Sequence, residues 1–188
     1  MRILLHVCCG PCAVYPVELL RGEGLSVQGY FFNPNIHPYQ EFRKRLQAAR
    51  QFSETIGFSL EAENEYGLQS FLRQVVFQEQ TRCGLCYAMR LRAAAAKAKE
   101  QAADAFTSTL LYSRYQRHEL IRKVGEKIAA EEGIPFYYRD FRIGWQQGID
   151  GAIAMELYRQ SYCGCIYSEQ ERYDKKLRRR LKRGEEKN

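Results

Sequence analysis

The chain has 188 residues and a net charge of +7; 45% of the residues are hydrophobic, 27% charged and 13% aromatic. This length is typical of one domain with its own core, and the composition excludes disordered, collagen-like and coiled-coil proteins. The first apolar run, Ile3 to Leu5, is too short for a membrane span or a signal peptide. We therefore expect a cytoplasmic protein without membrane contact, whose seven cysteines stay reduced and serve metal or redox chemistry.

Hydrophobic periodicity predicts strands and helices that alternate along the chain. In chain order these are a strand over Ile3–Val7, a helix over Val14–Leu20, a strand over Leu25–Phe32, a helix over Tyr39–Ile56, a strand over Phe58–Ala62, helices over Leu68–Phe77 and Cys86–Gln101, a strand over Ala105–Leu111, a helix over Leu120–Glu132, a strand over Pro135–Tyr138, a helix over Gly151–Tyr158 and a helical basic tail. The alternation predicts a single doubly wound, mostly parallel α/β sheet of the Rossmann-like (HUP) type with helices on both faces.

The last fifteen residues differ in charge from the rest of the chain. We divide the chain into a metal-binding catalytic domain, residues 1–173, and a basic tail, residues 174–188. The tail holds eight basic and three acidic side chains, so it carries +5 of the net charge of +7. Such a tail is typical of an arm that binds a polyanion, and a solvated helix end is the alternative. The tail residues predicted to bind RNA are Lys175, Lys176, Arg178, Arg179 and Arg180.

The turn after the first strand has the sequence Cys8-Cys9-Gly10-Pro11-Cys12. In doubly wound sheets, ligands bind beyond the carboxyl ends of the strands, where the strand order reverses. We therefore predict a metal site at the carboxyl end of the first strand.

The seven cysteines fall into three groups: Cys8, Cys9 and Cys12; Cys83 and Cys86; Cys163 and Cys165. Four cysteine thiolates bind an iron–sulfur cluster, and the remaining three leave an open position on a second metal, which suits catalysis. Structural zinc and a thiol redox pair are the alternatives that the spacing leaves open.

Around these cysteines the sequence resembles the QueH family, the cobalamin-independent epoxyqueuosine reductases. The resemblance is carried by six blocks: Leu5–Cys12, Phe32–Tyr39, Arg82–Tyr87, Thr107–Gln116, Asp140–Gly144 and Tyr158–Ser168. It implies reduction of epoxyqueuosine to queuosine, the last step of queuosine biosynthesis. The site would be the wobble position of the tRNAs for aspartate, asparagine, histidine and tyrosine.

The resemblance also implies a 4Fe–4S cluster beside a mononuclear iron, with Cys83 and Cys86 as cluster ligands. We complete the cluster with Cys9 and Cys165. The second iron is assigned to Cys8, Cys12 and Cys163. Within the pairs Cys8/Cys9 and Cys163/Cys165, the opposite assignment remains open.

The implied reaction needs a metal that polarises the epoxide oxygen, electrons and a proton donor. No flavin or nicotinamide fingerprint follows a strand, so we expect neither cofactor and an external electron donor. The candidate proton donors are His6, Tyr112, Tyr115 and Asp140. Of these, Tyr115 and Asp140 join Cys8 and Cys12 as predicted catalytic residues.

The remaining candidates each have a structural alternative. Arg142 is predicted to contact tRNA or to form an exposed ion pair with Asp140. We expect His6 to be a buried core residue, His37 to structure a turn or contact a ligand, and His118 to lie on the surface.

Two other functions remain as alternatives. An ATP-dependent, sulfur-inserting tRNA-modifying enzyme would need a pyrophosphate loop where Cys8–Cys12 lies. A zinc-binding RNA-binding module without catalysis would use the tail alone.

Overall fold

A four-stranded, all-parallel sheet forms the centre of the computed structural model, which describes residues 1–183. Its strands lie in the order β3-β2-β1-β4. The strands are β1 (Arg2–His6), β2 (Ser26–Phe31), β3 (Leu60–Ala62) and β4 (Ala105–Ser108). The α-helices are α1 (Gly10–Gly22), α2 (Tyr39–Thr55), α3 (Leu68–Val75), α4 (Arg82–Glu100), α5 (His118–Glu132), α6 (Trp145–Ala154), α7 (Ile166–Tyr173) and α8 (Lys175–Lys182). Two 3₁₀-helices, η1 (Thr109–Tyr112) and η2 (Phe141–Gly144), complete the described elements.

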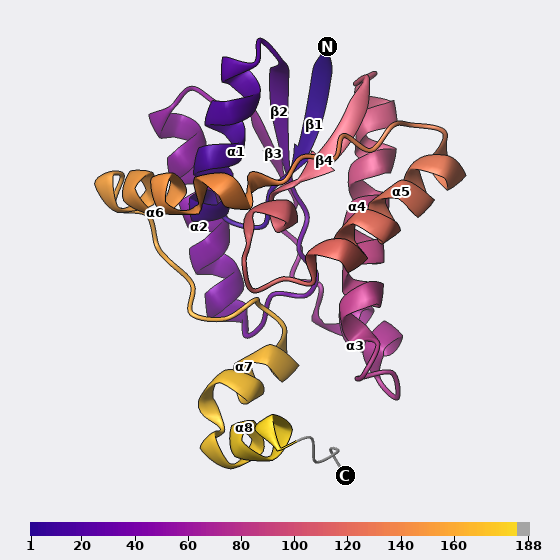
Figure 1. Cartoon of the computed structure of the whole chain (residues 1–188), viewed down its shortest axis with the longest axis vertical. Coiled ribbons are helices and arrows are strands. Elements are labelled where there is room, and N and C mark those ends of the chain that lie inside the picture. Colours follow the sequence, from indigo (N-terminus) through magenta and orange to yellow (C-terminus); the bar gives the residue numbers. More distant parts are fainter. Residues whose placement is uncertain (184–188) are drawn as a thin grey trace.

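Helices cover both faces of the sheet (Figure 1). The helices α1, α2 and α6 lie on one side, and α4 and α5 lie on the other. From β1 the chain adds β2 and β3 in one direction and then returns to the opposite side of β1 for β4. The strand order therefore reverses between β1 and β4, which confirms the doubly wound prediction and places the cysteine turn after β1 at the switch point.

The strands are apolar because both faces of the sheet are covered. Leu4, Leu5 and Phe106 are fully buried, and β4 is buried along its whole length. None of the helices in residues 1–183 combines the length and apolar character that crossing a bilayer requires.

The predicted fifth strand is reduced to one bridge. Phe106 pairs in parallel with Phe136, through bonds from Phe106 N to the Pro135 oxygen (3.0 Å) and from Tyr137 N to the Phe106 oxygen (2.8 Å). The prediction of a strand over Pro135–Tyr138 was wrong, although the segment lies at the expected edge. One reason is that β4 ends early, which leaves the segment few partners.

Two further boundaries differ from the predictions. Ser108 ends β4 because its side chain accepts a hydrogen bond from Leu110 N (3.1 Å), and this bond turns the chain into η1. The last predicted helix begins earlier, at Trp145, and ends at Ala154. Glu156 follows with a left-handed φ of 53°, which is incompatible with a continuing helix.

The basic tail begins as the helix α8, as predicted, with Asp174 as its N-cap. In Figure 1, α7 and α8 pack together beyond the lower end of the sheet. The end of the predicted tail, including Lys187, lies outside the described residues. The division at residue 173 stays a prediction.

We expect Gly10→Ala to destabilise the protein by about 1–3 kcal/mol, because added volume at a close contact forces packed elements apart. A Cβ at Gly10 would lie 2.3 Å from the backbone oxygen of Ala48, where α1 meets α2. Gly22→Ala, in the same helix and with nothing near its Cβ, is the control and should be neutral or stabilising by up to about 1 kcal/mol. Thermal unfolding measures both, and equal midpoints would contradict the prediction.

Candidate metal centre

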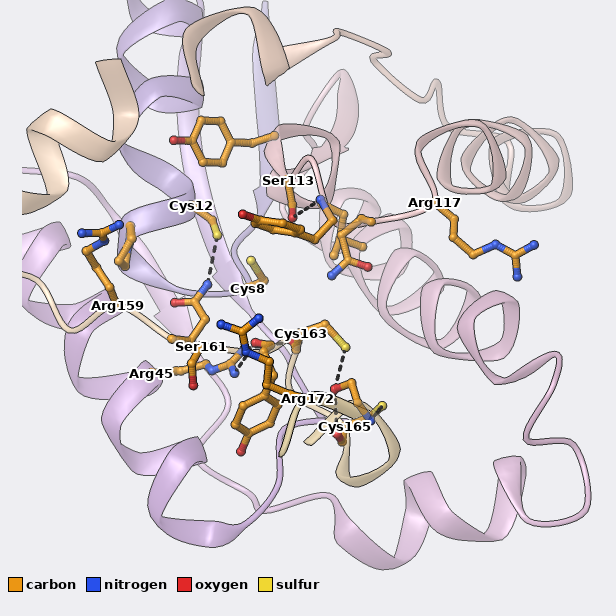
Figure 2. A pocket seen from close by; sticks show the side chains of 18 of the residues that line it. Cys8, Cys12, Arg45, Ser113, Arg117, Arg159, Ser161, Cys163, Cys165 and Arg172 are labelled. Atoms are coloured by element: carbon orange, nitrogen blue, oxygen red, sulfur yellow. Dashed lines mark hydrogen bonds between the residues drawn. The ribbon is translucent and has the colours of Figure 1, made fainter. Parts of the chain in front are cut away.

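A cavity of about 640 Å³ opens beyond the carboxyl ends of β1 and β4 (Figure 2). Cysteines from all three groups line it, although they are up to 157 residues apart: Cys8, Cys12, Cys83, Cys163 and Cys165. All seven cysteines are free thiols. The fold therefore brings five of the seven cysteines, with members of all three groups, to one cavity.

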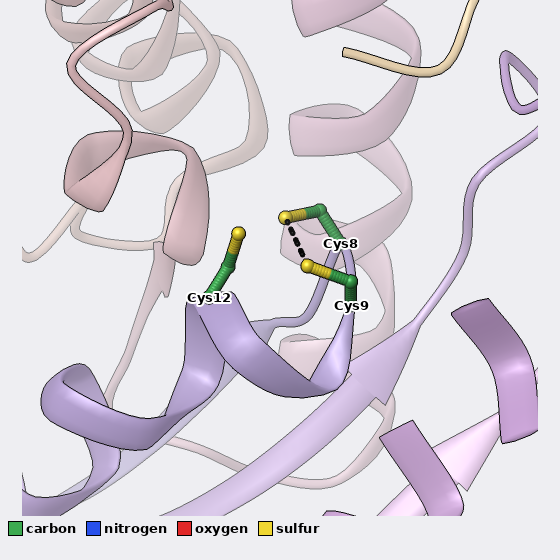
Figure 3. Close-up of side chains that lie close together, drawn as sticks. All are labelled: Cys8, Cys9 and Cys12. Carbon is green, nitrogen blue, oxygen red and sulfur yellow. Dashed lines mark hydrogen bonds between the residues drawn. The ribbon is translucent and has the colours of Figure 1, made fainter. Parts of the chain in front are cut away.

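Cys8, Cys9 and Cys12 form the tightest group. Their sulfur atoms all lie within 4.8 Å of one another, close enough to share one metal ion (Figure 3). Cys9 is extended and caps α1, whereas Cys12 lies in the first turn of that helix. Gly10 and Pro11 separate the two, and this short connection turns both sulfurs to the same side. Soft thiolates that converge in this way suit iron or zinc.

Hydrogen bonds among the three thiols shift their pKa values in opposite directions. Hydrogen bonds from Cys12 and Cys9 hold the pKa of Cys8 well below its usual value. The pKa of Cys12 is raised well above its usual value by the same interactions. Cys8 is therefore the thiol of this group that ionises most readily, and thiolates are the form that binds a metal.

Gln160 connects two of these sulfurs. Its Nε2 donates to Cys9 Sγ at 2.9 Å and to Cys12 Sγ at 3.3 Å. Its Oε1 is buried without a hydrogen-bond partner among the described residues. Hydrogen bonds donated to ligand sulfurs orient the ligands and adjust the reduction potential of a bound metal. The sequence analysis missed this role, and the only signal was that Gln160 lies within the block Tyr158–Ser168.

The other four cysteines form a second, looser group: among the described residues, only Cys8, Cys9 and Cys12 have three sulfurs within 4.8 Å of one another. Cys83 lies in the first turn of α4, and Cys86 follows about one turn later. Cys86 packs with Cys165 in a small buried cluster that includes Phe71 and Val75. Cys165 caps α7. A hydrogen bond from Cys163 lowers the pKa of Cys165 to about 5, which favours its thiolate.

A buried arginine lies between the two groups. Arg90 is 2% exposed and donates to Asn33 Oδ1 at 3.1 Å. Burial raises the pKa of Cys86 to about 11, and the positive charge of Arg90 opposes this shift. The same charge helps to lower the pKa of Cys8. Arg90 therefore stabilises negative charge on both groups of sulfurs.

Arg45 fixes the loop that carries Cys163. It is 1% exposed, and its guanidinium donates to Glu41 Oε1 (2.7 Å), the Cys163 oxygen (2.9 Å) and the Tyr162 oxygen (2.9 Å). Tyr158 donates to the other oxygen of Glu41 at 2.6 Å. The buried pair thus joins α2 to the C-terminal cysteine loop.

Glycine is required at position 164, between the two cysteines of this loop. Gly164 has a φ of 132°, and a Cβ there would lie 3.2 Å from Arg45, Asn35 and Ile36. Its oxygen accepts a hydrogen bond from His37 N at 2.8 Å. The tight contact with Arg45 is possible because residue 164 has no side chain.

The predicted proton donors differ in their burial and in their hydrogen bonds. His6 is fully buried between Ser108 Oγ (2.9 Å) and the Phe32 oxygen (3.0 Å), and burial lowers its pKa to about 4. It is the core residue we expected. Tyr112 and Tyr115 both line the cavity; Tyr112 is buried and donates to the Trp145 oxygen at 2.8 Å, and Tyr115 is 84% exposed.

Asp140 and Arg142 pair with each other. Arg142 Nη2 lies 2.6 Å from Asp140 Oδ2, and this hydrogen-bonded pair lowers the pKa of Asp140 to about 2. Neither residue is among those that line the cavity. Their predicted roles in catalysis and tRNA binding stay predictions.

The remaining two histidines are both buried. His118 begins α5 but is only 5% exposed, with Nε2 3.1 Å from the Tyr138 hydroxyl, so its surface prediction was wrong. His37 packs against Tyr66 and Phe71, and its backbone N–H holds Gly164. These contacts agree with the turn-structuring role.

The cavity is strongly basic. Glu171 is the one carboxylate among the described residues that line it, and Arg82 pairs with it at 2.6 Å. The lining arginines are Arg45, Arg82, Arg90, Arg117, Arg159, Arg172 and Arg178. A polyanion such as RNA fits this lining.

Comparisons with known proteins identify one family. A family model described as "Epoxyqueuosine reductase QueH" matches residues 3–171. The chain is 37% identical over 174 residues to a Dehalococcoides mccartyi protein named epoxyqueuosine reductase QueH, covering 93% of this chain and 96% of that one. It is 30% identical over 196 residues to the Thermotoga maritima protein of the same name, covering 97% of each.

A solved structure supports the fold. A predicted subunit of tRNA methyltransferase from Methanocaldococcus jannaschii superposes with a TM-score of 0.56 at 12% identity, covering 97% of this chain and 89% of that one. At this identity the likeness concerns the fold alone.

We expect Arg45→Met to destabilise the protein by about 3–5 kcal/mol, because it leaves buried Glu41 without its cation. Alkylation of Cys163 and Cys165, followed by mass spectrometry, should become faster as the loop detaches. Arg50→Met, which removes an exposed arginine from the same helix, is the control and should change stability by less than about 0.5 kcal/mol. Equal stability and labelling of the two variants would contradict the role of Arg45.

Proposed function

The chain belongs to the QueH family of epoxyqueuosine reductases, and we propose that its cysteines hold the metal groups of this reaction, a 4Fe–4S cluster and an adjacent iron. The protein is accordingly an oxidoreductase of queuosine biosynthesis that acts on tRNA. We assign to it the tRNAs for aspartate, asparagine, histidine and tyrosine. The reaction consumes two electrons and two protons, converts the epoxide to an alkene and releases the oxygen as water.

The observation that carries the metal proposal is the group Cys8, Cys9 and Cys12, whose sulfurs converge at the strand-order switch point. Cys83, Cys86 and Cys165 would hold three corners of the cluster; Cys86 and Cys165 share one small buried cluster, and Cys83 lines the cavity together with Cys165. Cys9 is our fourth ligand. Cys8 is the alternative, because it lines the cavity and Cys9 is completely buried.

The adjacent iron would be held by Cys8, Cys12 and Cys163. All three line the same cavity, and Cys8 lies between the other two in Figure 2. When bound, the iron supplies a Lewis acid for the epoxide oxygen, and the cluster supplies electrons one at a time. No dinucleotide-binding fingerprint is present in the sequence, so we propose an external electron carrier.

Aromatic side chains shape the mouth of the cavity. Trp145 stacks on Tyr112 with ring centroids 5.1 Å apart, and Tyr115 meets the edge of Trp145 at 5.7 Å. This wall offers a surface for an unpaired base. The Tyr112 hydroxyl already donates to Trp145. We therefore propose the Tyr115 hydroxyl as the group that holds the proton.

The two alternative functions have less support. The turn where a pyrophosphate loop would be needed is the cysteine group itself, which argues against an adenylating enzyme. A zinc module without catalysis would leave the family relationship unexplained.

The deciding experiment is anaerobic reconstitution with iron and sulfide, followed by incubation with epoxide-bearing tRNA and a chemical reductant. We expect mass analysis of the nucleosides to show loss of one oxygen atom. Protein loaded with zinc in place of iron is the control and should leave the nucleoside unchanged. Unchanged nucleoside with fully iron-loaded protein would refute the proposal.

Cysteine substitutions should separate the two metal groups. We expect Cys83→Ser to abolish both the cluster absorbance and turnover, because it removes a cluster ligand. Cys12→Ser should retain the absorbance and lower turnover by at least about 100-fold, because it removes only a ligand of the second iron. Iron analysis and visible absorbance measure the first effect, and nucleoside analysis the second.

The same measurements test the assignment within the first group. Cys9→Ser should lose the cluster absorbance, whereas Cys8→Ser should keep it. The reverse result would exchange their assignments, and full activity of Cys12→Ser would remove it from the iron site.

A further inference from the structure

A second cavity, of about 370 Å³, lies where α7 meets α8. It is lined by Arg172, Tyr173, Lys175, Arg178 and Arg179. Four of its five lining residues are cations, and no carboxylate lines it among residues 1–183. The cavity therefore suits an anion that presents several oxygen atoms.

The nearby carboxylates are already engaged. Asp174 caps α8 by accepting from Lys176 N and Leu177 N, both at 3.0 Å. Glu171 pairs with Arg82. Within the described residues, the four lining cations form no ion pair with any carboxylate. Their charge is available to a ligand.

The second cavity adjoins the metal-centre cavity. Arg172 and Arg178 line both. Tyr173, which lines the second cavity, contacts two residues of the larger one. Its hydroxyl lies 2.5 Å from Ser161 Oγ, and its ring packs edge-on against Tyr162 with the ring centroids 6.3 Å apart. Ser161 and Tyr162 belong to the rim of the larger cavity. A ligand with groups in both cavities would contact the two shared arginines.

We propose that the second cavity binds a backbone phosphate of the RNA, next to the nucleotide whose base enters the larger cavity. The inference rests on the proposed function in taking RNA as the substrate. Phosphate contacts of this kind position a nucleic acid without reading its sequence. The phosphate would hold the strand while the modified base reaches the cysteines, which favours RNA over the free nucleoside.

A specific phosphate site can be told apart from general attraction between RNA and the basic tail, because only some cations of α8 line the cavity. Lys175 and Arg179 line the cavity, whereas Lys176 and Arg180, on the same helix, do not. The double variants K175Q/R179Q and K176Q/R180Q therefore remove equal charge from α8. Only the first pair lines the proposed site.

The experiment measures binding of an anticodon stem–loop RNA to the full, reconstituted chain by fluorescence anisotropy over a range of salt concentrations. We expect K175Q/R179Q to weaken binding about tenfold or more. The slope of log affinity against log salt should fall by about 0.7 for each lost phosphate contact. K176Q/R180Q should lose clearly less. Equal losses in both variants, or no loss in either, would overturn the proposal.

A second measurement locates the phosphate. Stem–loop RNAs with one neutral methylphosphonate linkage, placed in turn around the wobble nucleotide, should bind the wild type more weakly at one or two positions. K175Q/R179Q should be insensitive at those positions, and K176Q/R180Q should keep the sensitivity. The absence of any such position would overturn the proposal. Binding is read without turnover, so a failed reductase assay with this pattern intact would count against the proposed function alone.

Discussion

The buried guanidinium of Arg45 is the interaction on which the arrangement of the cysteines depends. A charge taken out of water is stable only when it is paired and hydrogen-bonded, and Arg45 satisfies this with Glu41 and two carbonyl oxygens of the loop before Cys165. Those carbonyls lie 117 and 118 residues further along the chain. The loop has little secondary structure of its own. The hydrogen bonds from Arg45 therefore set the position of the loop, and Gly164 permits the close approach of the loop to the Arg45 side chain.

The parallel sheet supplies the other half of the centre. Because the strand order reverses beside β1, the turn of Cys8, Cys9 and Cys12 lies at the switch point, where doubly wound sheets bind their ligands. The helix α4 brings Cys83 and Cys86 to the same region from the opposite face of the sheet. Arg90, between the two groups, lowers the cost of negative charge on the sulfurs. The buried positive charge of Arg90 thus favours the ionised form of Cys8 and Cys86.

The arginines of the cavity fall into an inner, buried set and an outer, exposed set. Deep in the cavity, Arg45 and Arg90 serve the protein's own groups, whereas Arg172 and Arg178 at its outer side are exposed. In the proposed function, these outer cations attract the RNA strand, and the aromatic wall of Tyr112 and Trp145 receives its base. Gln160 adds a polar group at the inner end, with one oxygen still to be satisfied.

The sequence predicts the parallel α/β sheet, the cysteine turn after the first strand and the basic tail helix, because each leaves a local signature in periodicity, spacing or charge. It could not determine the partners of Arg45, Arg90 and Gln160, since a buried arginine and an exposed one look alike in a sequence. The burial of His118, the pairing of Asp140 with Arg142 and the loss of the fifth strand likewise depend on neighbours distant in the chain. These features emerge in the folded chain alone, because burial and long-range hydrogen bonds are properties of the packed chain, and local spacing does not record them.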